Sequence, residues 1–222
     1  MEEIIKQLRI RLRLAMDGAV SASMRNKGVA YKLNFGVTLP RLKEIAADFT
    51  PDAALAEYLW RQDIREFKIL ATLLYPAAGF TAVRAGEWEE QIKHVEIAEQ
   101  FCANLMQNEP FAPACAAAWI GRAADDGLVA TAGYLLYARL FLLRASLPAA
   151  DTEAFLGKSA ALLREPFSLA GQAAANALKR YGRQSETRAA EVLKAFDSFR
   201  DSGSPREQEI YEDLKFEFDY SR

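Results

Sequence analysis

Two segments between residues 34 and 76 decide the fold: NFGVTLPRLKEIAADF at 34–49 and LWRQDIREFKILATLLYP at 59–76. Their apolar residues recur every three or four positions, which is typical of helices that bury one face. Gly36 permits a turn that a side chain would resist, and Pro40 suits the first turn of the helix that follows. Between the segments, Thr50 and Pro51 mark the start of a separate helix. The stretch therefore predicts short helices joined by short connections.

The same spacing runs through the rest of the chain, where alternating strand patterns are scarce and Gly and Pro fall between the periodic segments. We predict an all-α fold. The expected helices are 3–23, 39–48, 51–61, 63–75, 87–107, 110–124, 126–146, 151–163, 167–182, 185–200 and 205–216. Each is too small to bury its own apolar face, so neighbours must stack into a bundle or an α-α superhelix, a helical repeat solenoid.

The length of 222 residues and an apolar content of 51% predict one domain over residues 1–222. Residues 205–222 are acidic and aromatic. This tail is either a final helix that caps the open end of the array or a segment that binds a partner.

Cysteine and histidine are too few for a zinc site or a disulfide framework, since the chain has only Cys102, Cys115 and His94. We expect no metal and no cofactor. The sequence shows neither a secretory signal nor a run apolar enough to span a bilayer, so we expect a cytoplasmic protein without a membrane partner. The net charge of −2 restricts any nucleic-acid contact to a local patch.

Both segments of the opening stretch resemble the DNA alkylation repair family of the AlkD type. The matching residues are Phe35, Gly36, Val37, Pro40, Leu42, Ile45, Ala46, Leu59, Trp60, Arg65, Glu66, Ile69 and Leu73. The resemblance implies HEAT-like helix pairs, duplex DNA as the partner and, in active members, hydrolysis of the N-glycosidic bond of alkylated purines by a carboxylate. Taken alone, the matching residues are core and capping positions.

The resemblance also points to a catalytic candidate. Family members carry a helix in which a Trp lines the DNA-facing cleft and an Asp stabilises positive charge on the sugar; here the positions hold Val95 and Glu99. Independently, one helix over 87–107 would place Glu99 at the edge of an apolar stripe and Glu96 on the polar side. Glu99 is then either the working carboxylate or the partner of an arginine in an ion pair between helices.

A second family signature matches residues 173–182, and its cleft aromatic is replaced by Asn176. In this helix four polar residues share the face opposite the apolar one: Gln172, Asn176, Lys179 and Arg183. Such side chains can bind DNA phosphates, or they can form an ordinary solvated surface.

Basic residues are also dense near the N-terminus, where Arg9 and Arg13 share a helix face and Arg25 and Lys27 are expected in the connection that follows this helix. Two functions remain open at this stage. The first is a DNA alkylation repair protein that binds duplex DNA by its backbone and uses Glu99 for glycosidic hydrolysis. The alternative is a helical-repeat scaffold without catalysis that binds DNA or a protein partner.

Overall fold

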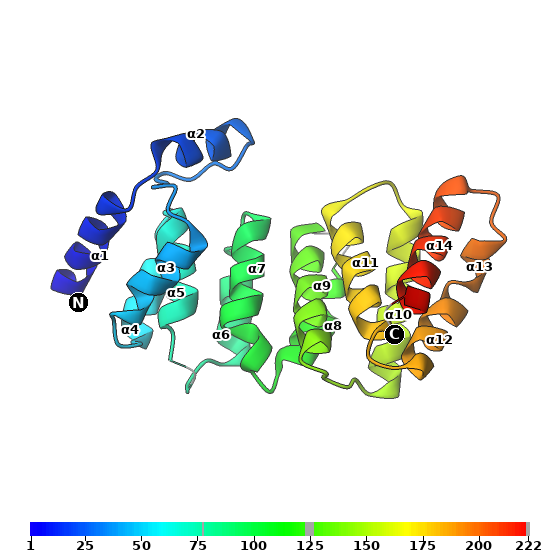
Figure 1. Cartoon of the computed structure of the whole chain (residues 1–222). Helices are drawn as coiled ribbons and strands as arrows, with labels where there is room; N and C mark the ends of the chain where they lie inside the picture. The colour runs from blue at the N-terminus through cyan, green and yellow to red at the C-terminus, as the bar shows by residue number, and fades with distance from the viewer. Residues whose placement is uncertain (77, 123–126, 221–222) are drawn as a thin grey trace. The chain divides into compact units, whose positions relative to one another are not determined.

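The computed structural model describes residues 1–76, 78–122 and 127–220, which form helices joined by short connections (Figure 1). The described residues form no β-strand, only an isolated parallel bridge between Leu33 and Ile64. The all-α prediction is confirmed. Among these residues, no helix combines the length and apolar character that crossing a membrane requires.

The chain divides into two compact units, Met1–Asn108 and Glu109–Arg222, called here the N-terminal and C-terminal units. Each is described by itself, and the single domain over 1–222 stays a prediction.

The N-terminal unit is built around α5, which packs against α3, α4 and α7. Its helices are α1 (Glu2–Leu14), α2 (Gly18–Asn26), α3 (Leu39–Ala47), α4 (Ala53–Trp60), α5 (Arg65–Leu74), α6 (Ala82–Glu89) and α7 (Val95–Asn104), followed by the 3-10 turn Met106–Asn108. Trp60 and Trp88 stack in the core with ring centroids 4.2 Å apart and planes 6° from parallel. Such aromatic burial supplies much of the apolar contact of a small helical unit.

The C-terminal unit is built around α11, which packs against α9, α10, α12 and α14. Its helices are α8 (Ala112–Ile120), α9 (Gly127–Leu142), α10 (Ala149–Arg164), α11 (Leu169–Gly182), α12 (Glu186–Ala195), α13 (Asp197–Arg200) and α14 (Pro205–Tyr220). Small residues let α11 approach its neighbours, because its buried face is mostly alanine and glycine. The expected tail is a helix as far as Tyr220, and residues 221–222 lie outside the described part.

Three of the predicted helices are each two helices. The span 3–23 breaks before α2 because the Asp17 side chain accepts hydrogen bonds from the N–H groups of Ala19 and Val20, at 2.9 and 3.0 Å, and so caps a new helix. The span 87–107 breaks at His94, whose extended backbone starts α7. The span 185–200 divides into α12 and α13. The apolar spacing continues across each break, so periodicity alone could not show it.

Candidate nucleic-acid interface

The connection between α2 and α3 turns sharply at Gly36, which has φ of +71°. A Cβ at this position would lie 2.2 Å from the backbone oxygen of Asp17 and 2.8 Å from the backbone nitrogen of Ser21. The Asp17 N–H also donates to the Phe35 carbonyl at 3.0 Å. Glycine is therefore required here both for the backbone conformation and for the close contact with the start of α2.

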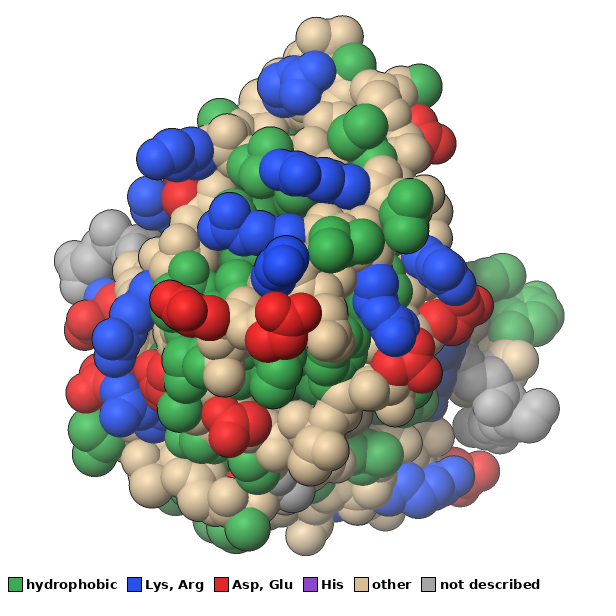
Figure 2. Space-filling view, turned by 90° about the vertical axis from the view of Figure 1, so that its left-hand side faces the viewer, with side chains coloured by type: hydrophobic (Ala, Val, Ile, Leu, Met, Phe, Trp, Pro, Cys, Tyr) green, Lys and Arg blue, Asp and Glu red, His purple; other side chains and the backbone are tan. Residues whose placement is uncertain are grey.

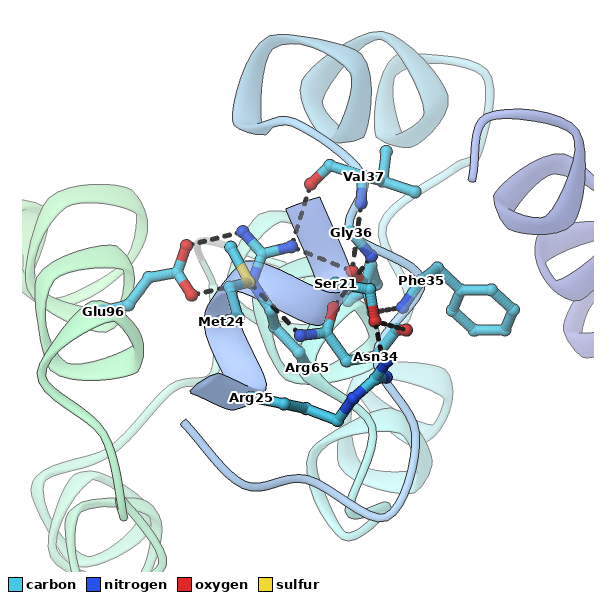
Figure 3. Close-up of polar contacts among 10 residues, drawn as sticks. Ser21, Met24, Arg25, Asn34, Phe35, Gly36, Val37, Arg65 and Glu96 are labelled. Carbon is cyan, nitrogen blue, oxygen red and sulfur yellow. Dashed lines mark hydrogen bonds and ion pairs between the residues drawn. The ribbon is translucent and has the colours of Figure 1, made fainter. Parts of the chain in front are cut away.

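A buried ion network from α5 and α7 holds this turn (Figure 3). The Glu66 carboxylate accepts the N–H groups of Phe35 and Val37 at 3.1 and 3.2 Å. Arg65 donates to the Val37 carbonyl and to Glu66, both at 2.8 Å. Its Nε and Nη2 then donate to the two oxygens of Glu96 at 2.7 and 2.6 Å. The turn is thus held both by the N–H groups that it donates and by the Val37 carbonyl that accepts.

The charges of this network compensate each other inside the unit. Arg65 is 2% exposed and Glu66 is fully buried. Burial by itself would lower the pKa of the Arg65 guanidinium, but the hydrogen bond and charge of Glu96 and the charge of Glu66 outweigh it, so the pKa is raised. A buried pair of this kind is costly to break, since either partner left alone would be an unpaired charge away from water.

Side-chain hydrogen bonds also join helix α2 to the turn at Gly36. Ser21 Oγ donates to the Asn34 carbonyl at 2.8 Å, and Arg25 Nη1 donates to Ser21 Oγ at 3.0 Å. The Asn34 amide contacts Met24 Sδ at 3.2 Å. Arg25 is exposed and held at its guanidinium, and Lys27 is the exposed residue that ends the helix.

The segment after Lys27 lies on the start of α7. Nε2 of His94 is 3.0 Å from the Ala30 carbonyl, and the Tyr31 and His94 rings have centroids 4.5 Å apart. The Lys32 N–H donates to the Asp63 carboxylate at 3.1 Å, while the Lys32 side chain is exposed. The connection is therefore supported by the residues that immediately precede α5 and α7.

Three exposed cations result from this arrangement, and we call Arg25, Lys27 and Lys32 the α2 surface. Within the described part of the chain, no carboxylate forms an ion pair with any of them. Two other cations of the unit are paired, since Arg11 contacts Asp48 and Arg41 contacts Glu44. Exposed and uncompensated Lys and Arg side chains on a fixed backbone are suited to binding phosphate groups.

The structure corrects the prediction for the first acidic residue of α7. Glu96 does not lie on a free polar face but forms the ion pair with Arg65 that Glu99 was considered for. The buried residues of α7 are Ile97, Ala98, Phe101 and Cys102, so Glu99 lies off the buried face and is exposed. Partial burial and the charge of Glu96 raise the pKa of Glu99. Among the described residues, Glu99 forms no ion pair.

In the C-terminal unit, helix α14 pairs with the cations of the predicted polar row. Lys179 Nζ lies 2.6 Å from Asp213 Oδ2 and 4.0 Å from Glu217 Oε2. Arg183 donates through Nε to Glu217 at 2.6 Å and also through Nη2. Two of the four predicted phosphate donors are therefore neutralised by α14.

The other two members of the row are exposed on α11. Gln172 is exposed, and the Asn176 side-chain oxygen accepts a hydrogen bond from Arg180 Nε at 3.2 Å. The row thus lies along one helix, as predicted, but only its first half is uncovered. Arg25, Lys27 and Glu99 belong to the N-terminal unit and the row to the C-terminal unit.

The anchoring role of Arg65, Glu66 and Glu96 is absent from the sequence prediction. A signal was available, because Arg65 and Glu66 open a helix whose other residues are almost all apolar, and all but one of its ten residues are buried. Charged residues in such a helix need partners, and a partner for Arg65 had to come from another element.

Comparisons with known proteins agree with the helical arrangement. A family model described as DNA alkylation repair enzyme matches residues 8–198. No curated protein matches the chain. One solved structure, described as a new family of proteins related to the HEAT-like repeat DNA glycosylases with affinity for branched DNA structures, aligns with a TM-score of 0.77 and 16% identity. The alignment covers 95% of this chain and 94% of that one. At this identity the likeness establishes the fold, and the HEAT-like prediction is confirmed.

Proposed function

The chain belongs to the DNA alkylation repair enzyme family, and from that premise we propose that it binds DNA through backbone phosphates, with the α2 surface as the main contact. The observation that carries the proposal is a set of three exposed cations that have no ion-pair partner among the described residues: Arg25 on α2, and Lys27 and Lys32 on the connection that follows it. Contacts to phosphates fix the position of a protein on DNA without reading bases.

Two further observations support a local DNA contact. The net charge of the chain is −2, so a general electrostatic attraction to DNA is excluded and a confined basic surface is needed. The solved structure with the same fold is described as having affinity for branched DNA structures. Branched DNA therefore belongs beside linear duplex among the ligands to be measured.

The test compares the wild type with the triple variant Arg25→Gln, Lys27→Gln and Lys32→Gln on linear duplex and on a four-way junction, over a series of salt concentrations. Loss of three phosphate contacts should reduce the slope of log K against log salt by about 2.5 to 3 units. The matched control removes the same charge from three exposed lysines of the C-terminal unit: Lys158, Lys194 and Lys215. Equal effects of the two variants, or no DNA binding by the wild type, would exclude the α2 surface as the contact.

A second candidate function, hydrolysis of the N-glycosidic bond, rests on Glu99. Its carboxylate is exposed and has no ion-pair partner among the described residues, as a group that stabilises an oxocarbenium-like transition state requires. The family's cleft aromatics are absent, with Val95 and Asn176 in their places. Release of free base from duplex DNA containing N-methylated purines, lost in Glu99→Gln while DNA binding persists, would establish it. If the wild type binds DNA but releases no free base, the protein is a DNA-binding scaffold without this activity.

A further inference from the structure

A groove of about 750 Å³ runs along α1 on the N-terminal unit, apart from the α2 surface. Its lining consists of Met1, Glu2, Ile5, Lys6, Arg9, Ile10, Arg13 and Tyr58 of α4. The neighbouring face of α1 is anchored in the core, since Leu8 and Leu12 are fully buried. The groove face is therefore fixed in direction, and nothing in the proposed function uses it.

The polar lining of the groove is mainly a row of three cations: Lys6, Arg9 and Arg13. They are spaced by three and four residues, so they follow one face of the helix over about 10 Å. The Arg9 guanidinium lies 5.7 Å from the centroid of the Phe67 ring, which limits its movement. Glu2 lies at the end of the groove nearest the start of α1, so the basic part of the groove lies toward the C-terminal end of this helix.

None of these three cations forms an ion pair with a carboxylate of the described residues, whereas Arg11 on another face of the same helix pairs with Asp48. Figure 2, which faces the side of the molecule where α1 lies, shows Lys and Arg side chains gathered across the upper part of this face, with acidic side chains mostly below and at its edges. Like charges placed side by side repel each other, and a ligand with regularly spaced negative charges relieves that repulsion.

A nucleic-acid strand has this regular spacing. One strand of duplex DNA carries a phosphate about every 3.4 Å along the axis, so a length of about 10 Å corresponds to about three intervals between successive phosphates. The groove is concave, with the Tyr58 side of α4 contributing to its lining, and a rounded strand can enter it.

Helices α1 and α2 run in different directions, as Figure 1 shows. The residues between them, Ala15 to Asp17, make the bend, and Asp17 begins α2. A straight duplex follows one direction, whereas a branched DNA offers arms in several. One basic surface follows α1, and the other lies at the end of α2 and on the connection after it, so the two can contact different arms of a branched ligand.

We propose that the α1 groove is a second phosphate-binding site, which holds the backbone of one arm of a branched DNA while the α2 surface holds another. The inference rests on the proposed function, because it requires that the α2 surface binds DNA. It assigns Lys6, Arg9 and Arg13 to phosphate contact and to the preference for branched over linear DNA.

The experiment measures binding of a four-way junction and of a linear duplex with arms of the same sequence by the variant Lys6→Gln, Arg9→Gln and Arg13→Gln. Junction affinity should fall by at least about tenfold, with the salt slope reduced by about 2.5 to 3 units, while linear duplex affinity changes much less. The control is the same triple neutralisation in the C-terminal unit: Lys158, Lys194 and Lys215. Circular dichroism confirms that each variant is folded.

Three results would overturn the proposal. Equal losses on junction and duplex would make the groove part of a single general contact. Unchanged junction binding would remove the groove from DNA contact, while a loss in the α2 variant would still support the proposed function. Binding of the wild type to phosphatidylserine vesicles, lost in the α1 variant with junction binding intact, would assign the groove to lipid headgroups. Absence of all DNA binding by the wild type would reject the proposed function itself.

Discussion

Replacing Glu66 by Gln should strongly destabilise the N-terminal unit. The carboxylate is fully buried and accepts hydrogen bonds from the N–H groups of Phe35 and Val37 and from Arg65. A glutamine keeps one acceptor oxygen but turns an NH₂ group toward one of these donors. An unsatisfied buried donor costs about 1–3 kcal/mol, and breaking a buried ion pair costs about 3–5 kcal/mol in total. We expect the free energy of unfolding to fall by about 3–5 kcal/mol.

Tryptophan fluorescence during urea unfolding measures this effect in the relevant unit. Trp119 belongs to the C-terminal unit, so a Trp119→Phe background leaves Trp60 and Trp88 of the N-terminal unit as reporters. With a slope of about 2 kcal/mol per molar urea, the midpoint should fall by about 1.5–2.5 M. DNA binding by the folded variant should also weaken, because the connection that carries Lys27 and Lys32 loses its anchor.

The matched control is Glu96→Gln. Glu96 is 26% exposed at its side chain, so water can replace part of what the substitution removes, and Arg65 keeps Glu66 as a partner. We expect this variant to lose only about 1–2 kcal/mol. A Glu66→Gln midpoint equal to that of Glu96→Gln, or equal to that of the parent, would refute the view that Glu66 holds the turn.

The remaining predictions concern the turn at Gly36, the ion pairs between α11 and α14, and a buried lysine. Gly36→Ala should lower stability by at least about 1–3 kcal/mol in urea unfolding, because φ is +71° and the new Cβ meets a backbone oxygen at 2.2 Å; Gly28→Ala, with φ of +80° and open space, should cost less. Neutralising Asp213 and Glu217 together should steepen the salt dependence of DNA binding by about 2 units, since two cations of α11 lose their partners, and an unchanged slope would show that they do not reach phosphates. Burial lowers the pKa of Lys68 to about 8. Between pH 8 and 10 the unfolded chain therefore binds more protons than the folded protein, and the free energy of unfolding should rise by about 2 kcal/mol relative to that of Lys68→Met. If the difference in unfolding free energy between the two proteins does not vary with pH, this effect of burial is contradicted.

The fold was predictable because its information is local. Apolar spacing of three and four is present along the chain, with proline or glycine between many of the periodic segments, and it indicated helices throughout. The breaks at Asp17 and His94 were not predictable from spacing, because the apolar spacing continues across both, and each break residue also contacts another element. Asp17 donates its N–H to the Phe35 carbonyl, and His94 packs against the Tyr31 ring.

The candidate site was only partly predictable, for the same physical reason. Placing Lys179 and Arg183 on one helix face needs only the helical period, and that placement is observed. Their pairing with Asp213 and Glu217 joins residues more than thirty positions apart, which spacing cannot show. The acidic tail at 205–222 was a reason to expect such pairing, because the like charges of the basic row repel each other when they are unpaired. Among the described residues of the N-terminal unit, no carboxylate pairs with Arg25 or Lys27, and for this reason our proposal places phosphate binding there and not on the covered half of α11.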